Sequence, residues 1–107
     1  MLGLMQDWPL LCHRIIEHAA RIHGNQEVVT RSVEGPIVRT TYAQIHQRAL
    51  KVSQMLDRAG IRLGDRVATL CWNHYAHLEC YFGIPAAGGV MHTLNLRLAP
   101  LFFPYDL

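Results

Sequence analysis

Residues 60–98 read GIRLGDRVATLCWNHYAHLECYFGIPAAGGVMHTLNLRL and carry most of the structural signal in this chain. The run from Arg66 to Trp72 predicts a largely buried strand, because apolar residues fill most of its positions instead of every second one. A second, shorter strand is expected from Val90 to Leu94, after the glycine pair at 88–89. A helix fits between the two strands. The stretch therefore predicts a right-handed βαβ unit of a parallel sheet, and the fold class is α/β.

The segment between these strands is expected to be helical, with Asn73 as its N-cap. It carries one apolar face, made of Tyr75, Leu78, Phe82 and Ile84. Pro85 lacks a backbone donor and clashes with the carbonyl of Tyr81, so we expect a kink or an early end of the helix there.

The N-terminal residues predict a first helix from Pro9 to His23. Pro9 suits a first helical turn, where its missing N–H would be unpaired anyway. The periodic apolar positions are Leu11, Ile15, Ala19 and Ile22. Two β-rich runs follow at residues 27–32 and 37–40, and the turn residues 34–36 between them predict a hairpin.

The helix that follows this hairpin has the clearest boundary signals. Thr41 and Gln44 have the spacing of a capping box, which starts the helix at Tyr42. Gly60 supplies its left-handed C-terminal cap. The expected core stripe consists of Tyr42, Ile45, Ala49, Val52, Leu56 and Ala59.

Composition limits the range of functions. The 107 residues suffice for one domain with one core, and 50% apolar with 17% charged residues is typical of a globular protein. The net charge is +2 and the basic residues are scattered, so nucleic acid is not an expected partner. Three cysteines without a Cys-x-x-Cys spacing predict neither a disulfide framework nor a redox site. The N-terminus lacks a basic region and no apolar run is long enough to span a bilayer, so a cytoplasmic location is expected.

Several motifs, taken in order, resemble the start of AMP-forming acyl-CoA synthetases, the adenylate-forming ligases. The segment 41–45, Thr-Tyr-Ala-Gln-Ile, resembles the family's Thr-Tyr-x-Glu-Leu, and residues 60–68 resemble its Gly-[Ile/Val]-x-x-Gly-Asp-x-Val-Ala. Asn73, Glu79, residues 83–90 and the Asn95 to Leu98 segment resemble the next helix and the strand that ends in Asn-Pro-Arg-Leu. Residues 92–95 are similar to the fatty-acid and medium-chain CoA ligase branch. The resemblance covers roughly residues 8–98 and implies the N-terminal part of the large domain, with helices packed on a partial parallel sheet.

The chain departs from the family pattern at two places. Leu96 stands where the family usually has proline, and residues 99–107 do not continue the pattern of a following helix. We therefore expect residues 1–98 to form a partial N-terminal subdomain and residues 99–107 to form a divergent tail.

The resemblance also implies chemistry for which the sequence lacks the residues. The complete enzyme would use ATP, Mg²⁺ and CoA to convert a fatty acid or other small carboxylic acid into its CoA thioester. The Ser/Thr/Gly-rich phosphate loop and the lysine near the acyl phosphate are absent here. The chain is thus expected to be an inactive fragment, a split gene product or a pseudogene product that contains no catalytic, cofactor-binding or metal-binding residue of its own.

Two residue groups need separate interpretations. The glycines at positions 60, 64, 88 and 89 have neither Walker nor Gly-x-Gly-x-x-Gly spacing and are assigned to turns and caps, with Asp65 bonding nearby backbone donors. His74, His77 and Cys80 are spaced so that two of them could share a helix face and bind a metal. No fourth ligand is evident, so we interpret the histidines as surface imidazoles.

The candidate substrate-end residues are His92, Asn95 and Arg97. They lie at the C-terminal end of a predicted parallel strand, which is where open α/β sheets place ligands. The alternative interpretation is that Asn95 makes a turn and Arg97 a surface ion pair.

Two function classes remain open at this point. In one, the chain is part of an acyl-CoA synthetase; in the other, it is a non-catalytic interaction or assembly module that pairs with a separate remainder or self-associates through an uncovered sheet edge. A stand-alone nucleotide-binding domain lacks its glycine fingerprint.

Overall fold

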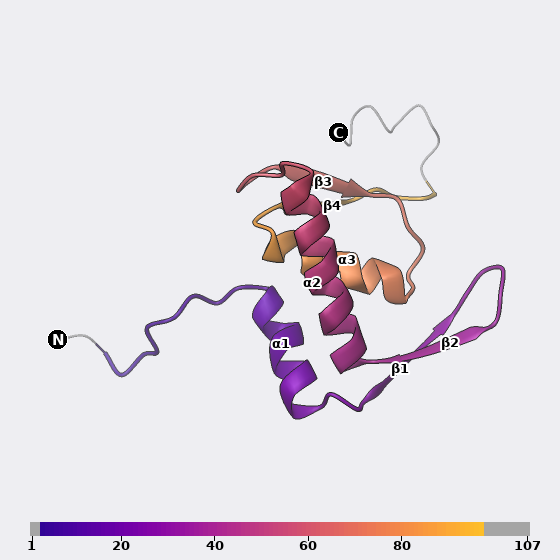
Figure 1. The fold of residues 1–107 in the computed structure, drawn as a ribbon, viewed down its shortest axis with the longest axis horizontal. Coiled ribbons are helices and arrows are strands. Elements are labelled where there is room, and N and C mark those ends of the chain that lie inside the picture. Colours follow the sequence, from indigo (N-terminus) through magenta and orange to yellow (C-terminus); the bar gives the residue numbers. More distant parts are fainter. Residues whose placement is uncertain (1–2, 98–107) are drawn as a thin grey trace.

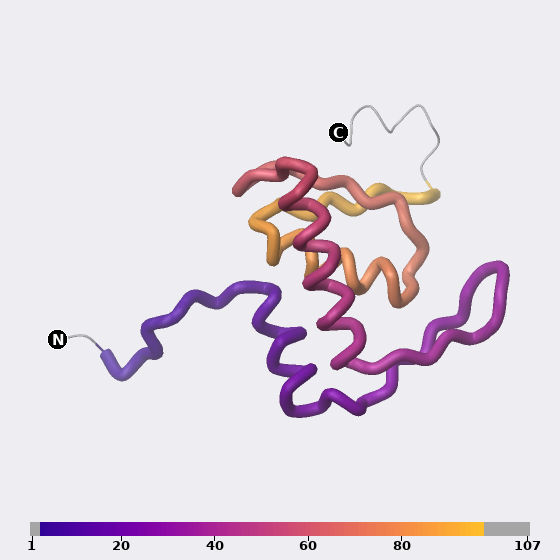
Figure 2. Tube along the Cα trace, viewed as in Figure 1, coloured from indigo at the N-terminus to yellow at the C-terminus, as the bar shows by residue number. Residues whose placement is uncertain are grey.

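The computed structural model describes residues 3–97, which form helices and two small sheets (Figures 1 and 2). In chain order the elements are α1 (His13–Ile22), β1 (Glu27–Arg31), β2 (Ile37–Thr41), α2 (Tyr42–Arg58), β3 (Arg66–Thr69), α3 (Tyr75–Ala86) and β4 (Val90–Thr93). This arrangement confirms the α/β class.

Strands β3 and β4 pair in parallel, and α3 connects them, as the sequence predicts. The register runs from Arg66 opposite Val90 to Thr69 opposite Thr93. At the start of the pair, the Val90 N–H donates to the Asp65 carbonyl at 2.8 Å, so pairing begins directly after the turn. Asp65 also fixes that turn, since its Oδ2 accepts from the Arg62 N–H at 2.7 Å. The predicted role of this aspartate as a turn residue is confirmed.

The hairpin of β1 and β2 and the following helix also form where predicted. The two strands are antiparallel, with Glu27 opposite Thr41, and Arg39 forms an ion pair with Glu27 at 2.6 Å. Both hydrogen bonds of the capping box are present between Thr41 and Gln44. Gly60 follows the helix with φ +84°, in the left-handed region that glycine adopts without strain.

The core lies where α2 and α3 pack against each other, with α1 on the side of α2 (Figure 1). The buried apolar residues in the described part of the chain are Ile16, Ile45, Ala49, Leu56 and Ile84. Gly83 allows α2 and α3 to approach closely. Glu79, on the same helix, is buried and its carboxylate accepts from Arg48 Nε at 3.1 and 3.2 Å.

The first helix starts later than predicted. It begins at His13 instead of Pro9. Two hydrogen bonds that span three residues close its first turn, from the Arg14 N–H to the Leu11 carbonyl and from the Ile15 N–H to the Cys12 carbonyl. Leu11, Ile15 and Ile22 are exposed and Ile16 is the buried position, so the predicted apolar face is wrong. Residues 3–12 are exposed, so no packing favours continuing the helix toward Pro9.

The βαβ unit requires three smaller corrections. The N-cap of α3 is His74, not Asn73, because His74 Nδ1 accepts from the His77 N–H at 3.3 Å. Strand β3 ends at Thr69, and Arg66 and Ala68 are exposed, so it is not largely buried. Its run of apolar residues has only one covered face, since α3 packs against a single side of the pair. Strand β4 ends at Thr93, one residue before the predicted end.

The helix α3 extends one residue past Pro85 and ends at Ala86. The predicted tail at residues 99–107 lies outside the described residues. Within residues 3–97, no helix has the length and apolar character needed to cross a membrane.

Candidate functional site

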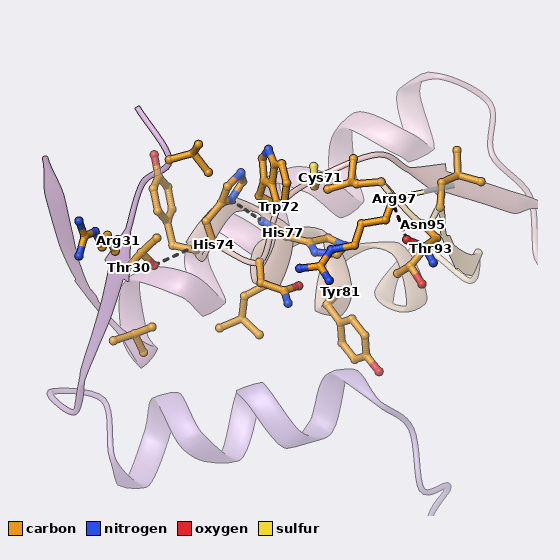
Figure 3. Close-up of a pocket in the computed structure, with 17 residues that line it drawn as sticks. Thr30, Arg31, Cys71, Trp72, His74, His77, Tyr81, Thr93, Asn95 and Arg97 are labelled. Carbon is orange, nitrogen blue, oxygen red and sulfur yellow. Dashed lines mark hydrogen bonds between the residues drawn. The ribbon is translucent and has the colours of Figure 1, made fainter. Parts of the chain in front are cut away.

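An open cavity of about 890 Å³ lies between the hairpin and the βαβ unit (Figure 3). Its walls come from β1, the β3–α3 loop, one face of α3 and the segment after β4. The site therefore forms at the C-terminal ends of β3 and β4, the edge where parallel sheets usually place ligands. Trp72 and His74 project from the loop, whereas Asn95 and Arg97 come from the end that follows β4.

Hydrogen bonds among its own residues hold the loop side of the cavity. His77 Nε2 lies 3.2 Å from Thr69 Oγ1, which joins α3 to the end of β3. His74 caps α3, as described above, and its Nδ1 is therefore occupied. The two histidines predicted as surface imidazoles are half-buried, and each is hydrogen-bonded within the chain.

The hairpin side is tied to the same helix by a buried threonine. Thr30 of β1 is buried, and its Oγ1 accepts from the Tyr75 N–H at 3.2 Å. This bond satisfies one of the backbone donors that a helix start leaves without a partner. The bond fixes the position of the hairpin relative to α3, across 45 residues of sequence.

The structure separates the three predicted substrate-end residues. Asn95 and Arg97 line the cavity, whereas His92 is not among its lining residues. His92 Nε2 is buried and makes no hydrogen bond within the described part of the chain. Asn95 Oδ1 accepts from the Arg97 N–H at 2.9 Å, so Asn95 does make a turn. Arg97 takes part in neither of the two ion pairs found among residues 3–97.

The metal hypothesis gains no support from the placement of its ligands. Among the residues that the structure describes, no three His, Cys, Asp or Glu side chains are placed to hold one ion. Both histidines of the predicted group have hydrogen-bond partners instead. Cys80 is half-buried, and burial raises the pKa of its thiol above the ordinary value, with Cys71 and Glu79 acting in the same direction.

The residues of this segment do not fit an ATP–Mg²⁺ complex. A phosphate loop needs backbone N–H groups that point freely at the ligand. The glycine amides here are used internally: Gly64 N–H donates to the Gly88 carbonyl at 2.9 Å, Gly88 N–H to Pro85 at 3.0 Å and Gly89 N–H to Ile84 at 3.0 Å. The assignment of these glycines to turns and caps agrees with their geometry, and no chemical step is assigned to them.

The sequence did not predict two features of the site. One is the hydrogen bond from the Tyr75 N–H to Thr30 Oγ1, and the other is the apolar wall of the cavity. That wall includes Trp72, Tyr81 and Val33. Period and spacing show contacts within one element, but these residues come from elements far apart in the chain. The one sequence signal for this site was the predicted βαβ unit. In a parallel pair the loop after β3 and the end of β4 lie at the same edge of the sheet.

The geometry defines an α/β segment with a βαβ unit, and comparisons with known proteins identify its family. Residues 16–101 match the AMP-binding enzyme family. The chain is 46% identical to a long-chain-fatty-acid–CoA ligase of Thermus thermophilus over 103 residues, which cover 96% of this chain and 19% of that protein. It is 45% identical to a 3-methylmercaptopropionyl-CoA ligase of Ruegeria pomeroyi over 107 residues, which cover all of this chain and 20% of that protein.

A solved structure shows the same arrangement. The N-terminal domain of FACL13 from Mycobacterium tuberculosis superposes with a TM-score of 0.77 at 28% identity, covering 92% of this chain and 24% of that one. This chain therefore belongs to the AMP-binding enzyme family. It spans about a fifth of the length of the two curated relatives.

Proposed function

We propose that this chain is the N-terminal scaffold segment of an ATP-dependent acid–CoA ligase. The complete form would activate a carboxylic acid as its acyl-adenylate and transfer the acyl group to CoA, using ATP and Mg²⁺. The observation that carries this proposal is the family match over residues 16–101, which includes the whole βαβ unit. In this proposal residues 1–98 belong to the ligase domain.

The 107 residues by themselves are proposed to be inactive. Support comes from the glycine turns described above, because the N–H groups of Gly64, Gly88 and Gly89 donate to backbone carbonyls of the same chain and do not form a phosphate loop. The role left to the segment is to form one wall of the domain and to hold Asn95 and Arg97 at the end of β4. Of the three predicted substrate-end residues, Asn95 and Arg97 line the cavity and remain proposed to face the substrate end, whereas His92 does not line it.

The finer assignment is to the fatty-acid and medium-chain branch, with a cytoplasmic location. The branch proposal rests on residues 92–95, His-Thr-Leu-Asn. The relatives named above act on different acids, a long-chain fatty acid and 3-methylmercaptopropionate, so a panel of acids is needed.

ATP–pyrophosphate exchange tests both the ligase assignment of the complete protein and the inactivity of the isolated chain. The isolated chain is expected to give no exchange with carboxylic acids of two to eighteen carbons. The complete polypeptide that contains this segment is expected to exchange fastest with medium-chain acids. Turnover by the isolated chain would refute the inactive role, and failure of the complete form with every acid would refute the ligase assignment.

A second candidate function is an interaction or assembly module. The observation that favours it is the exposure of large apolar side chains on both sheets, among them Val29 and Ile37 of the hairpin and Val90 of β4. Size-exclusion chromatography with light scattering distinguishes the two, since a self-associating module gives a stable dimer at micromolar concentration. A monomer at that concentration argues against this alternative.

A further inference from the structure

The cavity between the hairpin and the βαβ unit keeps polar side chains that have no partner within residues 3–97. Arg31 and Arg97 line it and take part in neither of the two ion pairs found there. The amide of Asn73 and the Nδ2 atom of Asn95 also line it, and neither makes a hydrogen bond in the described part of the chain. Several donors with free bonding capacity therefore face one hollow, as small-molecule sites require.

The charges that line this cavity have one sign. Among residues 3–97, two arginines line it and no aspartate or glutamate does. Glu79 lies on the same helix but is buried and bonded to Arg48, outside the lining. Because a guanidinium is always protonated and no carboxylate of the lining neutralises it, the cavity attracts anions.

Two large aromatic side chains form part of the same lining. Trp72 is 52% exposed and Tyr81 is 51% exposed, so solvent reaches both rings. Figure 3 shows the Arg97 side chain extending from the segment after β4 toward the middle of the cavity. A flat apolar ligand can pack against aromatic rings while its anionic group bonds to a guanidinium.

The size and the donors of the cavity limit the class of ligand. Its volume of about 890 Å³ lies in the range of small-molecule sites, roughly 300–1,000 Å³. Phosphate sites commonly use free backbone N–H groups at a glycine-rich turn, and the glycine amides at residues 64, 88 and 89 are already bonded within the chain. The fork of one guanidinium instead matches the two oxygens of a carboxylate.

We propose that this cavity binds a small aromatic carboxylate. The carboxylate accepts hydrogen bonds from the Arg97 guanidinium, and the amides of Asn73 and Asn95 are further donors. The aromatic ring packs against Trp72 and Tyr81. This binding activity uses only residues of the segment, so it is additional to the proposed ligase role and does not depend on it.

A comparison of three matched compounds tests the proposal. The ligand 3-phenylpropionate, its neutral amide and the aliphatic acid hexanoate are titrated against the Trp8→Phe form of the 107-residue chain. Trp8 lies outside the cavity lining, and its removal leaves Trp72 as the single tryptophan, whose fluorescence reports binding. We expect 3-phenylpropionate to bind with a dissociation constant of about 1 mM, as its small size allows. The amide lacks the charge and hexanoate lacks the ring, so both are expected to bind about fivefold more weakly.

Substitution of Arg97 identifies the donor. Arg97→Gln is expected to weaken binding of 3-phenylpropionate about tenfold and to leave binding of the amide unchanged, because only the acid uses the guanidinium charge. Arg58→Gln is the matched control, since it changes an exposed arginine of α2 that does not line the cavity, and it is expected to bind like the unmodified chain. Circular dichroism of each variant checks that the helices remain.

The compound comparison needs no substitution in the cavity, so it tests the site even where a variant loses its fold. Equal affinity for the acid and its amide, or no fluorescence change at concentrations well above 3-phenylpropionate's expected dissociation constant, would overturn the proposal. Equal weakening by Arg97→Gln and Arg58→Gln would also overturn it. ATP–pyrophosphate exchange by the complete polypeptide decides the ligase assignment separately, whichever result the titration gives.

Discussion

At the residue scale, the most consequential pair is Arg48 and Glu79. The Glu79 side chain is 5% exposed and that of Arg48 is 59% exposed, so the carboxylate is buried and its partner reaches it from the surface. Removing the arginine leaves a buried carboxylate without its charged donor. We expect Arg48→Met to lower the free energy of unfolding by about 1–3 kcal/mol, measured by urea denaturation. This is less than for a fully buried pair, because solvent screens the exposed arginine.

Two matched variants show whether loss of the ion pair itself causes the lower stability of Arg48→Met. Arg58→Met changes an exposed arginine in the last turn of the same helix and is expected to change stability by less than about 0.5 kcal/mol. Arg48→Met/Glu79→Leu removes both charges and should recover most of the loss, since replacing both partners with apolar groups can be nearly neutral. A double variant as unstable as Arg48→Met alone would contradict this account.

A second residue-scale prediction concerns the Cys80 thiol. Burial raises the pKa of Cys80, so a smaller fraction of it is thiolate at pH 8 than for a thiol in water. Because the thiolate is the reactive form, iodoacetamide is expected to modify Cys80 more slowly than the exposed Cys12 at that pH. The difference should narrow as the pH rises through the raised pKa. Peptide mass spectrometry over time measures both rates, and faster modification of Cys80 would show that the helix opens.

At the scale of elements, the approach of α2 to α3 depends on one glycine. A methyl group at Gly83 would lie 2.7 Å from the Ala49 carbonyl oxygen and 2.7 Å from Val52 Cβ. Both distances are shorter than a van der Waals contact allows, so the two helices must move apart. We expect Gly83→Ala to cost about 1–3 kcal/mol in chemical denaturation, a typical cost of overpacking.

Two comparisons distinguish steric overlap between the helices from the backbone cost of replacing any glycine by alanine. Val52→Ala removes part of the clash and should partly rescue Gly83→Ala. It should not rescue Gly60→Ala, where nothing lies within 4 Å and the cost comes from φ +84°. Identical behaviour of the two glycine variants toward Val52→Ala would refute close helix approach as the cause.

The accuracy of the sequence predictions follows the range over which each signal acts. The capping box at Thr41, the left-handed Gly60 and the Asp65 turn depend on residues within three or four positions, and all three are confirmed. The order of strand, helix and strand was also predictable, because the period of apolar residues changes along the chain. The start of the first helix was not predictable from Pro9, since its extent depends on packing that residues 3–12 lack.

The candidate site was harder to predict because its contacts cross long stretches of sequence. Two of the three predicted substrate-end residues, Asn95 and Arg97, line the cavity at the edge after β4, whereas His92 does not. The apolar wall and the Thr30–Tyr75 bond depend on where the hairpin lies relative to α3, which no local pattern encodes. The burial predicted for β3 failed for a related reason: a run of apolar residues predicts burial on both faces, but α3 covers only one.

At the scale of the whole molecule, the described part of the chain buries few apolar side chains for its exposed apolar surface. Five apolar residues are buried, whereas Leu63, Leu70, Trp72 and Val90 are among the large apolar residues that are exposed. Because burial of apolar surface is the main stabilising contribution, the isolated chain is expected to be only marginally stable.

The isolated 107 residues are therefore expected to bind the dye ANS and to unfold in urea over a broad range, with an m-value near or below about 1 kcal/mol/M, the low end for small proteins. Addition of the part of the Thermus thermophilus relative that begins where its match to this chain ends should reduce ANS fluorescence and sharpen the transition, because it covers the exposed apolar surface. Bovine serum albumin at the same concentration serves as the control for non-specific protein. A sharp transition without ANS binding by the chain alone would show that its own core is sufficient and that the exposed apolar residues need no partner.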